Sequence, residues 1–405
     1  MSKISLNCVK YFLCKQPTQK EILDMSHSNT IFNQLLSLVP RHEFENLAKE
    51  HDTGRRIRTF SRWNQFVHLA FIHLSARRSM RDGIRNMSAN FKQLYHLGAR
   101  PAARSTFSDA NNKRPAELFQ ALFGKLYQRC EPVAPKHKFR FKAKLYSLDA
   151  STVKLCLSVF PWASFRKKRG GIKLHTVLDH DGYIPAFMHV TNARRHESRL
   201  TRTLRLPKGS IVTFDRGYIS YPWFEALTES GVFFVTRQKN NASYRVLKRR
   251  PVNRKQGVTS DQEILVKTRR GELKLRRIGY RDPKTGKHYK YLTNHFTLSA
   301  KTIADIYKER WQIEIFFRLI KQNLKLKSFI GNSENAVLSQ VYVAMIVYLL
   351  LAYLKFRSRI GPSLQKMIQL LQLNLFQRTD LESLFKPPEK MSKIKTTYPL
   401  LAWAS

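Results

Sequence analysis

Acidic residues are scarce in this sequence of 405 residues. It has 28 Asp and Glu against 73 Lys and Arg, which gives a formal net charge of +45. This excess is far beyond what solubility requires. Neutralising the phosphates of a polyanion releases counterions and drives binding, so we expect a nucleic acid as the partner. The positive charge runs through every segment among apolar residues, unlike the basic tail or single amphipathic helix of ribosomal and membrane-surface proteins.

Cysteine is also rare, and its spacing carries no motif. The four cysteines, Cys8, Cys14, Cys130 and Cys156, show no CxxC spacing and no neighbouring pair of histidines. A zinc site and a disulfide framework are therefore not expected. The first residues, MSKISLNCVKYFLCKQ, contain no apolar stretch of signal-peptide length. We therefore expect a cytoplasmic protein.

Long apolar runs are limited to one. Residues 336–354, AVLSQVYVAMIVYLLLAYL, are 19 residues without a charge, which is long enough to cross a bilayer. The alternative is a helix that is buried on all sides within a large domain. The run contains Ser339, Gln340 and three tyrosines and follows a basic helix, which favours burial. A membrane anchor stays open as the second interpretation.

Residues from about 30 to 130 have the apolar spacing of consecutive short helices, as in IFNQLLSL, RWNQFVHLAFIHL and RPAELFQALFGKLYQRC. Two basic clusters lie in this region, and the second recurs every four residues as on one helix face. A run of charge is ordinarily a solvated face, but the net charge of the chain favours contacts with DNA phosphates. The arginines concerned are Arg55, Arg56, Arg58 and Arg62, then Arg77, Arg81 and Arg85.

After Pro132 and Pro135 the pattern changes to strands. KFRFKAKLYSLDAS predicts a strand that ends at Asp149, and GIKLHTVLD with YIPAFMHVT predicts a hairpin. A short helix near HESRLTRTL follows, then a buried strand, SIVTF, that ends before Asp215. YPWFEALTES predicts another helix and GVFFVTR another strand. This order predicts a mixed α/β sheet with helices on its faces.

Further strands, with turns at RRGE and DPKTGK, fill the region up to about Phe296. The predicted organisation has five parts. They are an all-α N-terminal DNA-binding domain (1–131), a first part of the mixed-sheet core (132–239), a β-rich insertion (240–296), a second part of that core (297–360) and a C-terminal tail that we assign to oligomerisation (361–405).

The segment from Ala304 to Lys327, ADIYKERWQIEIFFRLIKQNLKLK, has the spacing of an amphipathic helix with an unusual polar stripe. At ~100° per residue, Tyr307, Arg310, Glu314 and Lys321 lie at about 0°, −60°, −20° and −40° around the axis. They share one narrow face. That face is either solvated or one wall of an active site.

Three acids have positions from which an α/β sheet presents catalytic groups: Asp149 and Asp215 at strand ends and Glu314 on the later helix. Carboxylates of this kind bind Mg²⁺, and two such ions ~4 Å apart support an in-line displacement at phosphorus. Carboxylates among so many basic groups are expected to stay ionised. Individually, each aspartate can equally be a turn residue and Glu314 a surface residue.

Other polar residues compete as ligands. Asp179, His180 and Asp181 lie in the predicted hairpin turn, where the aspartates are expected to be turn residues. His196 and Glu197, in RRHES, lie between two candidate catalytic strands and stay open.

The spacing Y-(2)-R-(3)-E-(6)-K at Tyr307, Arg310, Glu314 and Lys321, with Asp149 in LDAS and Asp215 in DRGY, resembles the signature of the insertion-sequence-4 (IS-4) family of DDE transposases. FNQLLSLVPRHEFENLAKEH and RTFSRWNQFVHLAFIHLSARRSMRD are similar to the helical domain that precedes the catalytic domain in one branch of that family. The resemblance implies an RNase H-like mixed-sheet core with a β-rich insertion, preceded by an all-α N-terminal domain.

By this resemblance, Asp149, Asp215 and Glu314 would be catalytic and would hold two Mg²⁺ ions, for which Mn²⁺ can substitute. Tyr307, Arg310 and Lys321 would contact the DNA strand ends. The chain would be the transposase of a bacterial insertion sequence, associated with the nucleoid and free of membranes. It would bind terminal inverted repeats and target DNA, act as a dimer in the DNA complex, and catalyse metal-dependent strand cleavage and transfer.

Some family members form a hairpinned DNA end, which requires a platform for an unpaired base. Trp162, Trp223 and Trp311 are candidates, with core packing as the alternative role for each. A catalytically inactive, sequence-specific DNA-binding protein derived from a transposase is the alternative function.

Overall fold

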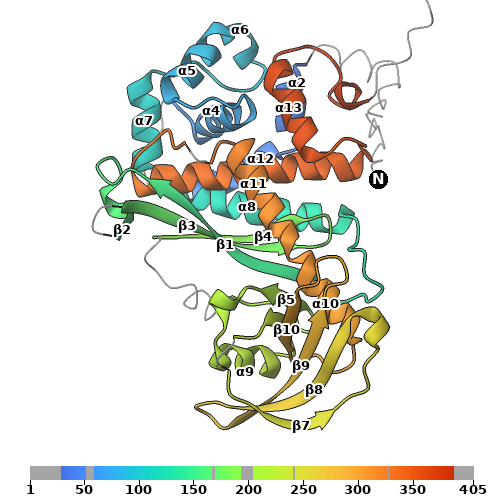
Figure 1. The fold of residues 1–405 in the computed structure, drawn as a ribbon. Helices are drawn as coiled ribbons and strands as arrows, with labels where there is room; N and C mark the ends of the chain where they lie inside the picture. Colours follow the sequence, from blue (N-terminus) through green and yellow to red (C-terminus); the bar gives the residue numbers. More distant parts are fainter. Residues whose placement is uncertain are drawn as a thin grey trace, which may run out of the picture.

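A computed structural model describes residues 29–51, 59–166, 169–192, 204–239, 242–326 and 328–386. In these residues a layer of helices covers one end of a long, twisted sheet, and the other end of the sheet projects away from them (Figure 1). All ten described strands belong to this one sheet.

The core of the sheet has the order β4–β3–β1–β5–β6. β3 pairs with β4 and with β1 in antiparallel fashion, whereas β1, β5 and β6 are parallel to one another. This is the order and direction of an RNase H-like sheet, so the predicted fold class is confirmed. The strands are β1 (Leu145–Leu155), β2 (Ser164–Arg166), β3 (Arg169–Asp179), β4 (Ile184–Asn192), β5 (Ile211–Phe214) and β6 (Phe233–Arg237).

The residue types in these strands match how deeply the strands are buried. β5, IVTF, is buried at every position, as expected for a short parallel strand with both faces covered. The hairpin of β3 and β4 turns at Gly182, whose positive φ of 67° suits glycine. Phe356 lies so close to Gly182 that a β-carbon there would clash with its ring.

The β-rich insertion continues the core sheet rather than forming a separate layer. β10 pairs antiparallel with β6, and β9, β8 and β7 follow outward. The predicted turns at RRGE and DPKTGK connect β8 to β9 and β9 to β10. The bounds are β7 (Arg245–Arg249), β8 (Val258–Lys267), β9 (Glu272–Arg281) and β10 (His288–Thr293).

The region from 30 to 130 is helical, as predicted. Ser61 and Ser79 cap α4 and α5 by accepting hydrogen bonds from the backbone N–H groups of Asn64 and Asp82. The helices are α2 (Ile31–Leu36), α3 (Arg41–His51), α4 (Arg62–Leu74), α5 (Met80–Ala89), α6 (Phe91–Leu94), α7 (Arg104–Lys113) and α8 (Glu117–Cys130).

The long apolar run forms α12 (Glu334–Arg357), which lies between the N-terminal helices and the sheet. It contacts α4, α7, α8 and β4, and α8 beside it also packs on β4. Among the described residues it is the only helix long and apolar enough to span a membrane, and 89% of its most apolar window is buried inside the protein. The prediction of a buried helix is confirmed.

The start of the predicted C-terminal tail packs back on the helical layer. α13 (Leu364–Asn374) contacts α4 and α12, and η6 (Ser383–Phe385) follows it. The backbone N–H groups of Ile31 and Phe32 donate to the carbonyl oxygens of Gln377 and Leu375, each at 2.9 Å. Oligomerisation through 361–405 stays a prediction, and residues 387–405 lie outside the described part.

Three boundaries differ from the prediction. β1 begins only at Leu145, because the preceding segment forms local contacts: His137 lies 2.9 Å from the carbonyl oxygen of Ala143, and Phe139 stacks on Phe141. The same strand continues past Asp149.

The predicted helix from 304 to 327 is two helices, α10 (Ala300–Glu309) and α11 (Trp311–Gln322), which meet at Arg310. The short helix predicted near HESRLTRTL falls almost wholly on residues 193–203, outside the described part.

His73 joins three helical segments. Its Nδ1 lies 2.7 Å from the carbonyl oxygen of Leu324, just after α11, and its Nε2 lies 3.0 Å from that of Gln340 on α12. Burial lowers the pKa of His73 from 6.5 to about 4, and it outweighs the two carbonyl oxygens, which favour the charged ring. The folded protein therefore keeps this ring neutral.

A histidine with a depressed pKa stabilises the fold fully above its unfolded pKa, and this stabilisation is lost as the pH falls from 6.5 toward 4. Between pH 7.5 and 4.5, His73 should account for a loss on the order of 2–3 kcal/mol in the free energy of unfolding. Urea titrations of wild type and His73→Gln at both pH values test this. The variant should lose correspondingly less than wild type, whereas the exposed His96→Gln should match wild type; equal pH dependence in His73→Gln would contradict the assignment.

Candidate active site

The parallel register of three strands places the two aspartates side by side. Leu148 on β1 is paired with Phe214 on β5, and Phe214 is paired with Thr236 on β6. The next residue along each strand is Asp149, Asp215 and Arg237, respectively. Asp149 was predicted at the end of its strand, but it lies within β1, which continues to Leu155. The site forms there because β5, its neighbour, ends at that level.

α10 and α11 carry the other predicted residues. α10 packs against β5, β6, β8 and β9 through buried residues such as Ile303 and Ile306, and α11 contacts β1. The buried face of α11 includes Ile313 and Phe317. This packing turns the junction of the two helices toward the carboxyl edge of β1 and β5.

The guanidinium of Arg310 binds two of the three acids. Its Nη1 donates to Oδ2 of Asp149 at 2.7 Å, and its Nη2 donates to Oε1 of Glu314 at 3.0 Å. The Arg310 side chain is only 13% exposed. Within the described part of the chain, its Nε is buried without a hydrogen-bond partner. Arg310 therefore connects the sheet to α11 at the centre of the site.

Tyr307 completes the connection. Its hydroxyl donates to Oδ1 of Asp215 over a long 3.4 Å, and the Arg310 guanidinium lies 5.7 Å from the centre of its ring. The ring itself packs on Tyr291 of β10, with centroids 5.1 Å apart. All three acids are thus linked by Tyr307 and Arg310, which the sequence had grouped on one stripe.

Burial dominates the electrostatics of Asp149. It raises the pKa of Asp149 to about 6, and the nearby Asp215 and Glu314 add to the rise, whereas Arg310 and the N–H of Ala150 oppose it. Burial also disfavours the charge on Arg310, but attraction to Asp149 and the other acids raises its pKa overall. With a pKa of about 6, Asp149 is still mostly ionised at neutral pH, as expected, but it takes up a proton at a higher pH than an exposed aspartate because desolvation outweighs the adjacent cation.

Lys321 lies farther along the same strand. Its Nζ donates to the backbone oxygen of Thr152 at 2.8 Å. Thr152 is three residues beyond Asp149, or about 10 Å along an extended strand. Lys321 therefore extends the positive charge of the site along β1.

The donor set suits a hard divalent cation, since carboxylate oxygens are the ligands that Mg²⁺ prefers. Among the described residues, no three side chains of His, Cys, Asp or Glu lie close enough together to hold one ion in their present positions. Asp149 and Glu314 instead share the Arg310 guanidinium. A positive charge thus already occupies the position between two of the acids, which fits a site that binds cations.

Comparison with known proteins agrees with this geometry. The family model of the transposase DDE domain matches residues 140–350, more than half of the chain. A second model, of a domain of unknown function (DUF4372), matches residues 27–100. The chain belongs to the DDE transposase family.

Three relatives carry transposase names. A protein of Sinorhizobium fredii, named as transposase y4zB, is 34% identical over 72% of this chain and 81% of its own length. One of Geobacillus stearothermophilus, named for insertion sequence element IS5377, is 29% identical over 82% of this chain and 86% of its own. One of Synechocystis, named for insertion sequence element IS4SA, is 24% identical over 71% and 82%. The resemblance to IS-4 transposases is confirmed, and this transposase functions in DNA transposition.

The N-terminal arginines of the transposase divide into three groups. Arg62 is buried, and it donates to Oε1 of Gln65 at 3.1 Å and to the carbonyl oxygen of Pro115, so its prediction as a phosphate contact is wrong. Arg77 precedes α5 and lies 3.5 Å from Asp82, whereas Arg81 and Arg85 are exposed on α5 itself. Arg55, Arg56 and Arg58 lie outside the described residues.

The acids of the hairpin turn have a structural role. Lys144 lies 2.8 Å from Oδ2 of Asp179 and 3.0 Å from Oδ2 of Asp181. The N–H of Asp181 donates to Oδ1 of Asp179. Their prediction as turn residues rather than metal ligands agrees with these contacts. His196 and Glu197 lie outside the described residues.

The structure separates the three candidate tryptophans. Trp223 is buried, and the indole of Trp162 donates to the carbonyl oxygen of Asn332. Trp311 is 53% exposed and directly follows Arg310. Of the three, Trp311 has the most exposed side chain.

Arg237 is a site residue that no motif indicated. It stands beside Asp215 in the strand register, and its guanidinium lies 4.9 Å from the ring centre of Tyr289. Its Nε is buried without a hydrogen-bond partner among the described residues. The available signal was its place at the end of the predicted strand GVFFVTR, next to that of Asp215.

Replacing Arg310 by Ala should leave the partly buried Asp149 without its cation. Removal of one partner from a buried pair typically costs about 3–5 kcal/mol, and partial exposure of this pair should place the loss at the lower end. Metal-free urea unfolding measures it. The exposed Arg318→Ala on α11 is the matched control and should change stability by less than about 0.5 kcal/mol; equal losses for both variants would refute the role of Arg310 in the fold.

Proposed function

We propose that this transposase cleaves DNA at the ends of a bacterial insertion sequence and joins the free 3′-hydroxyls to target DNA at the site of Asp149, Asp215 and Glu314. The observation that supports this most strongly is the strand register, which brings Asp149 next to Asp215, combined with the Arg310 bridge to Glu314. The three acids are 66 and 99 residues apart in the sequence, so only the fold can assemble them.

The proposed cofactors are two Mg²⁺ ions, or Mn²⁺ in their place, held by Asp149, Asp215 and Glu314. When bound, they would activate the attacking hydroxyl and stabilise the leaving oxygen of an in-line displacement. The remaining roles belong to the protein itself. Arg310 has a planar fork of donors that matches a phosphate, and Lys321 supplies a point charge farther along the strand.

Tyr307 acts in this proposal as a positioning residue and a strand-end contact. Its ring is fixed on Tyr291, and its hydroxyl reaches Asp215. A donor held in this way can orient the Asp215 carboxylate or a phosphate oxygen without loss of further conformational freedom.

Joining two element ends to one target requires at least two active sites, so we propose a dimer in the DNA complex. The partners are the terminal inverted repeats and target DNA, which also accounts for the net charge of +45. Association with the nucleoid follows from the same charge.

Asp149→Asn, Asp215→Asn and Glu314→Gln should each lower end cleavage to less than about one-hundredth of the wild-type rate, because each removes an ionised oxygen ligand. The assay uses purified protein, Mg²⁺ and labelled DNA that carries the inverted repeats bracketing the gene. A gel-shift assay in EDTA should show wild-type end binding. Full cleavage by any of the three variants would refute the assignment. Wild-type end binding without cleavage under Mg²⁺ or Mn²⁺ would favour the inactive DNA-binding protein instead.

Arg81 and Arg85 are the N-terminal arginines for which exposure supports a phosphate contact. The double variant Arg81→Ala/Arg85→Ala should reduce the slope of log K against log salt by about 1.8 for duplex DNA and weaken binding of all sequences alike. Filter binding between 50 and 200 mM salt measures the slope.

The matched control is Lys366→Ala/Arg378→Ala, which removes two exposed charges from α13 and the segment after it. This control should leave the slope near that of wild type. If both double variants reduce it equally, the effect is one of net charge and not of a contact by α5.

A further inference from the structure

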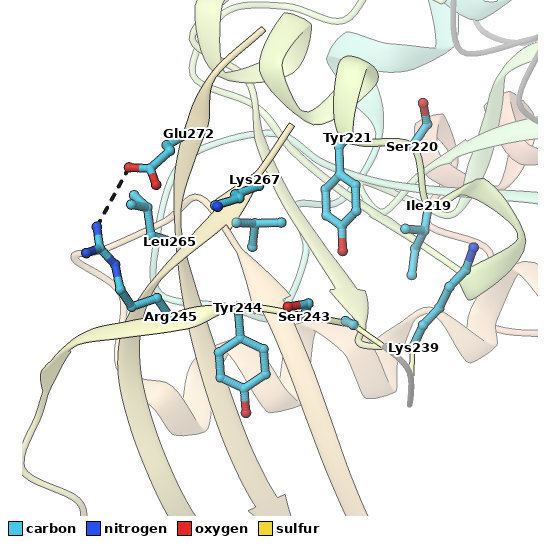
Figure 2. Close-up of a pocket in the computed structure, with 12 residues that line it drawn as sticks. Ile219, Ser220, Tyr221, Lys239, Ser243, Tyr244, Arg245, Leu265, Lys267 and Glu272 are labelled. Atoms are coloured by element: carbon cyan, nitrogen blue, oxygen red, sulfur yellow. Dashed lines mark ion pairs between the residues drawn. The ribbon is translucent and has the colours of Figure 1, made fainter. Parts of the chain in front are cut away.

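Glu309 is a buried acid of the transposase that the proposed reaction does not use. It is the last residue of α10 and directly precedes Arg310, and its side chain is only 8% exposed. None of the described residues that line the cavity of about 760 Å³ between α9 (Tyr221–Glu229) and the insertion strands belongs to α10 (Figure 2). A buried acid, even when it is paired, seldom adds net stability to a fold. The role of Glu309 is therefore sought in the geometry that it fixes.

Three side chains hold the Glu309 carboxylate. The hydroxyl of Tyr183 donates to Oε1 at 2.9 Å, and Nε2 of Gln312 donates to the same oxygen at 3.1 Å. Lys138 forms an ion pair with Oε2, but its own side chain is 64% exposed, so this pair contributes little. Gln312 is the second residue of α11, so the carboxylate spans the junction of α10 and α11.

Tyr183 is held in place independently of Glu309. It follows Gly182 in the turn between β3 and β4, and its backbone oxygen accepts a hydrogen bond from the hydroxyl of Tyr348 on α12 at 2.9 Å. Its φ of 54° lies in the left-handed region, which is unfavourable for a residue other than glycine and persists only where the surroundings impose it. The turn therefore holds the tyrosine in the conformation from which its hydroxyl reaches Glu309.

The same turn is connected to the strand that carries Asp149. Nε2 of His180 lies 2.6 Å from the hydroxyl oxygen of Ser147, which is on β1 two residues before Asp149. The His180 ring also packs against that of Tyr183, with ring centres 5.6 Å apart. One turn thus contacts both β1 and the junction of α10 and α11.

We propose that Glu309 and Tyr183 are positioning residues that hold this junction, and with it the Arg310 guanidinium, in place against β1. The contact of Arg310 with Asp149 is one polar link between junction and sheet, and the bond from Tyr183 is a second, at the adjacent residue. Glu314 lies in the first turn of α11, so its position depends on the same junction. The inference rests on the proposed function, because it assumes that cleavage takes place at the three acids.

The test compares two variants that each remove one hydroxyl bond to a buried carboxylate. Tyr183→Phe removes the bond to Glu309, and the matched control Tyr127→Phe, on α8, removes a bond of 3.0 Å to Asp179 of the same β3–β4 hairpin. With saturating DNA ends and Mg²⁺, Tyr183→Phe should lower the single-turnover cleavage rate at least about tenfold, because a shift of about 1 Å at a catalytic group can cost a hundredfold. Tyr127→Phe should cleave like wild type, and both variants should bind the ends like wild type in a gel-shift assay in EDTA. Equal cleavage rates for the two variants would overturn the inference.

Substitutions of Glu309 separate its hydrogen bonds from its charge. Glu309→Gln keeps an oxygen that accepts from Tyr183 and Gln312, and it loses only the pair with the exposed Lys138, so it should retain at least about half of the wild-type rate. Glu309→Leu keeps a similar volume without an acceptor and should lower the rate at least about tenfold, with end binding unchanged. A rate for Glu309→Gln as low as that of Glu309→Leu would contradict a role of these hydrogen bonds.

Hydrogen exchange followed by mass spectrometry gives a result that does not depend on cleavage. In metal-free buffer, the amides of residues 305–316 in the full chain should exchange at least about fivefold faster in Tyr183→Phe than in wild type, because the junction opens more often. In Tyr127→Phe these amides should exchange like wild type, even if urea unfolding shows equal losses of stability for the two variants. Equal acceleration in both would mean that the Tyr183 hydroxyl acts only on overall stability, which would overturn the inference.

Failure of this inference and failure of the proposed function give different results. If wild type and Tyr183→Phe cleave the ends equally well, the positioning role is refuted and the proposed reaction stands. If wild type binds the ends but does not cleave them under Mg²⁺ or Mn²⁺, the proposed reaction is refuted. The exchange measurement then decides by itself whether Tyr183 holds the junction of α10 and α11.

Discussion

The contact on which the site depends is the guanidinium of Arg310 between Asp149 and Glu314. Burial raises the pKa of Asp149 to about 6 even though the cation of Arg310 opposes the rise, so loss of that cation would raise the pKa further. Arg310 provides that charge from the junction of α10 and α11. α10 packs on β5, β6, β8 and β9 and α11 packs on β1, so the Arg310 side chain links the junction of these two helices to β1.

The helical layer and the sheet form one folded unit through α12. This helix is buried, and it contacts α4, α7 and α8 of the helical layer as well as β4 of the sheet. One continuous apolar cluster includes residues of the N-terminal helices, α12, α13 and the β3–β4 hairpin. The DUF4372-like region is therefore packed on the rest of the protein through this shared core. DNA bound by α5 would be held in a set position relative to the carboxyl edge of β1 and β5.

Much of the fold could be predicted because its strands and helices are locally consistent. The hairpin, the apolar strand before Asp215 and the helical spacing up to Cys130 each follow from period and turn chemistry. Predictions were wrong where a tertiary contact decided the outcome. Alternating residues before Leu145 did not form a strand because His137 binds within the segment, and Arg62 became buried because Gln65 and Pro115 accept its hydrogen bonds. Arg237 was missed, because its place at the end of GVFFVTR becomes meaningful only once the strand order sets β6 beside β5.

The insertion hydrogen-bonds to the core through β10 and β6, so it is continuous with the strands that carry the acids. The insertion and the core strands therefore form one continuous sheet. Hydrogen-bonded pairs connect β7, β8, β9, β10 and β6 in that order, and β6 lies next to β5, which Asp215 follows. Changes in loop length at the outer turns would leave this pairing intact. A register slip between β6 and β10 would instead shift the whole insertion relative to Asp215.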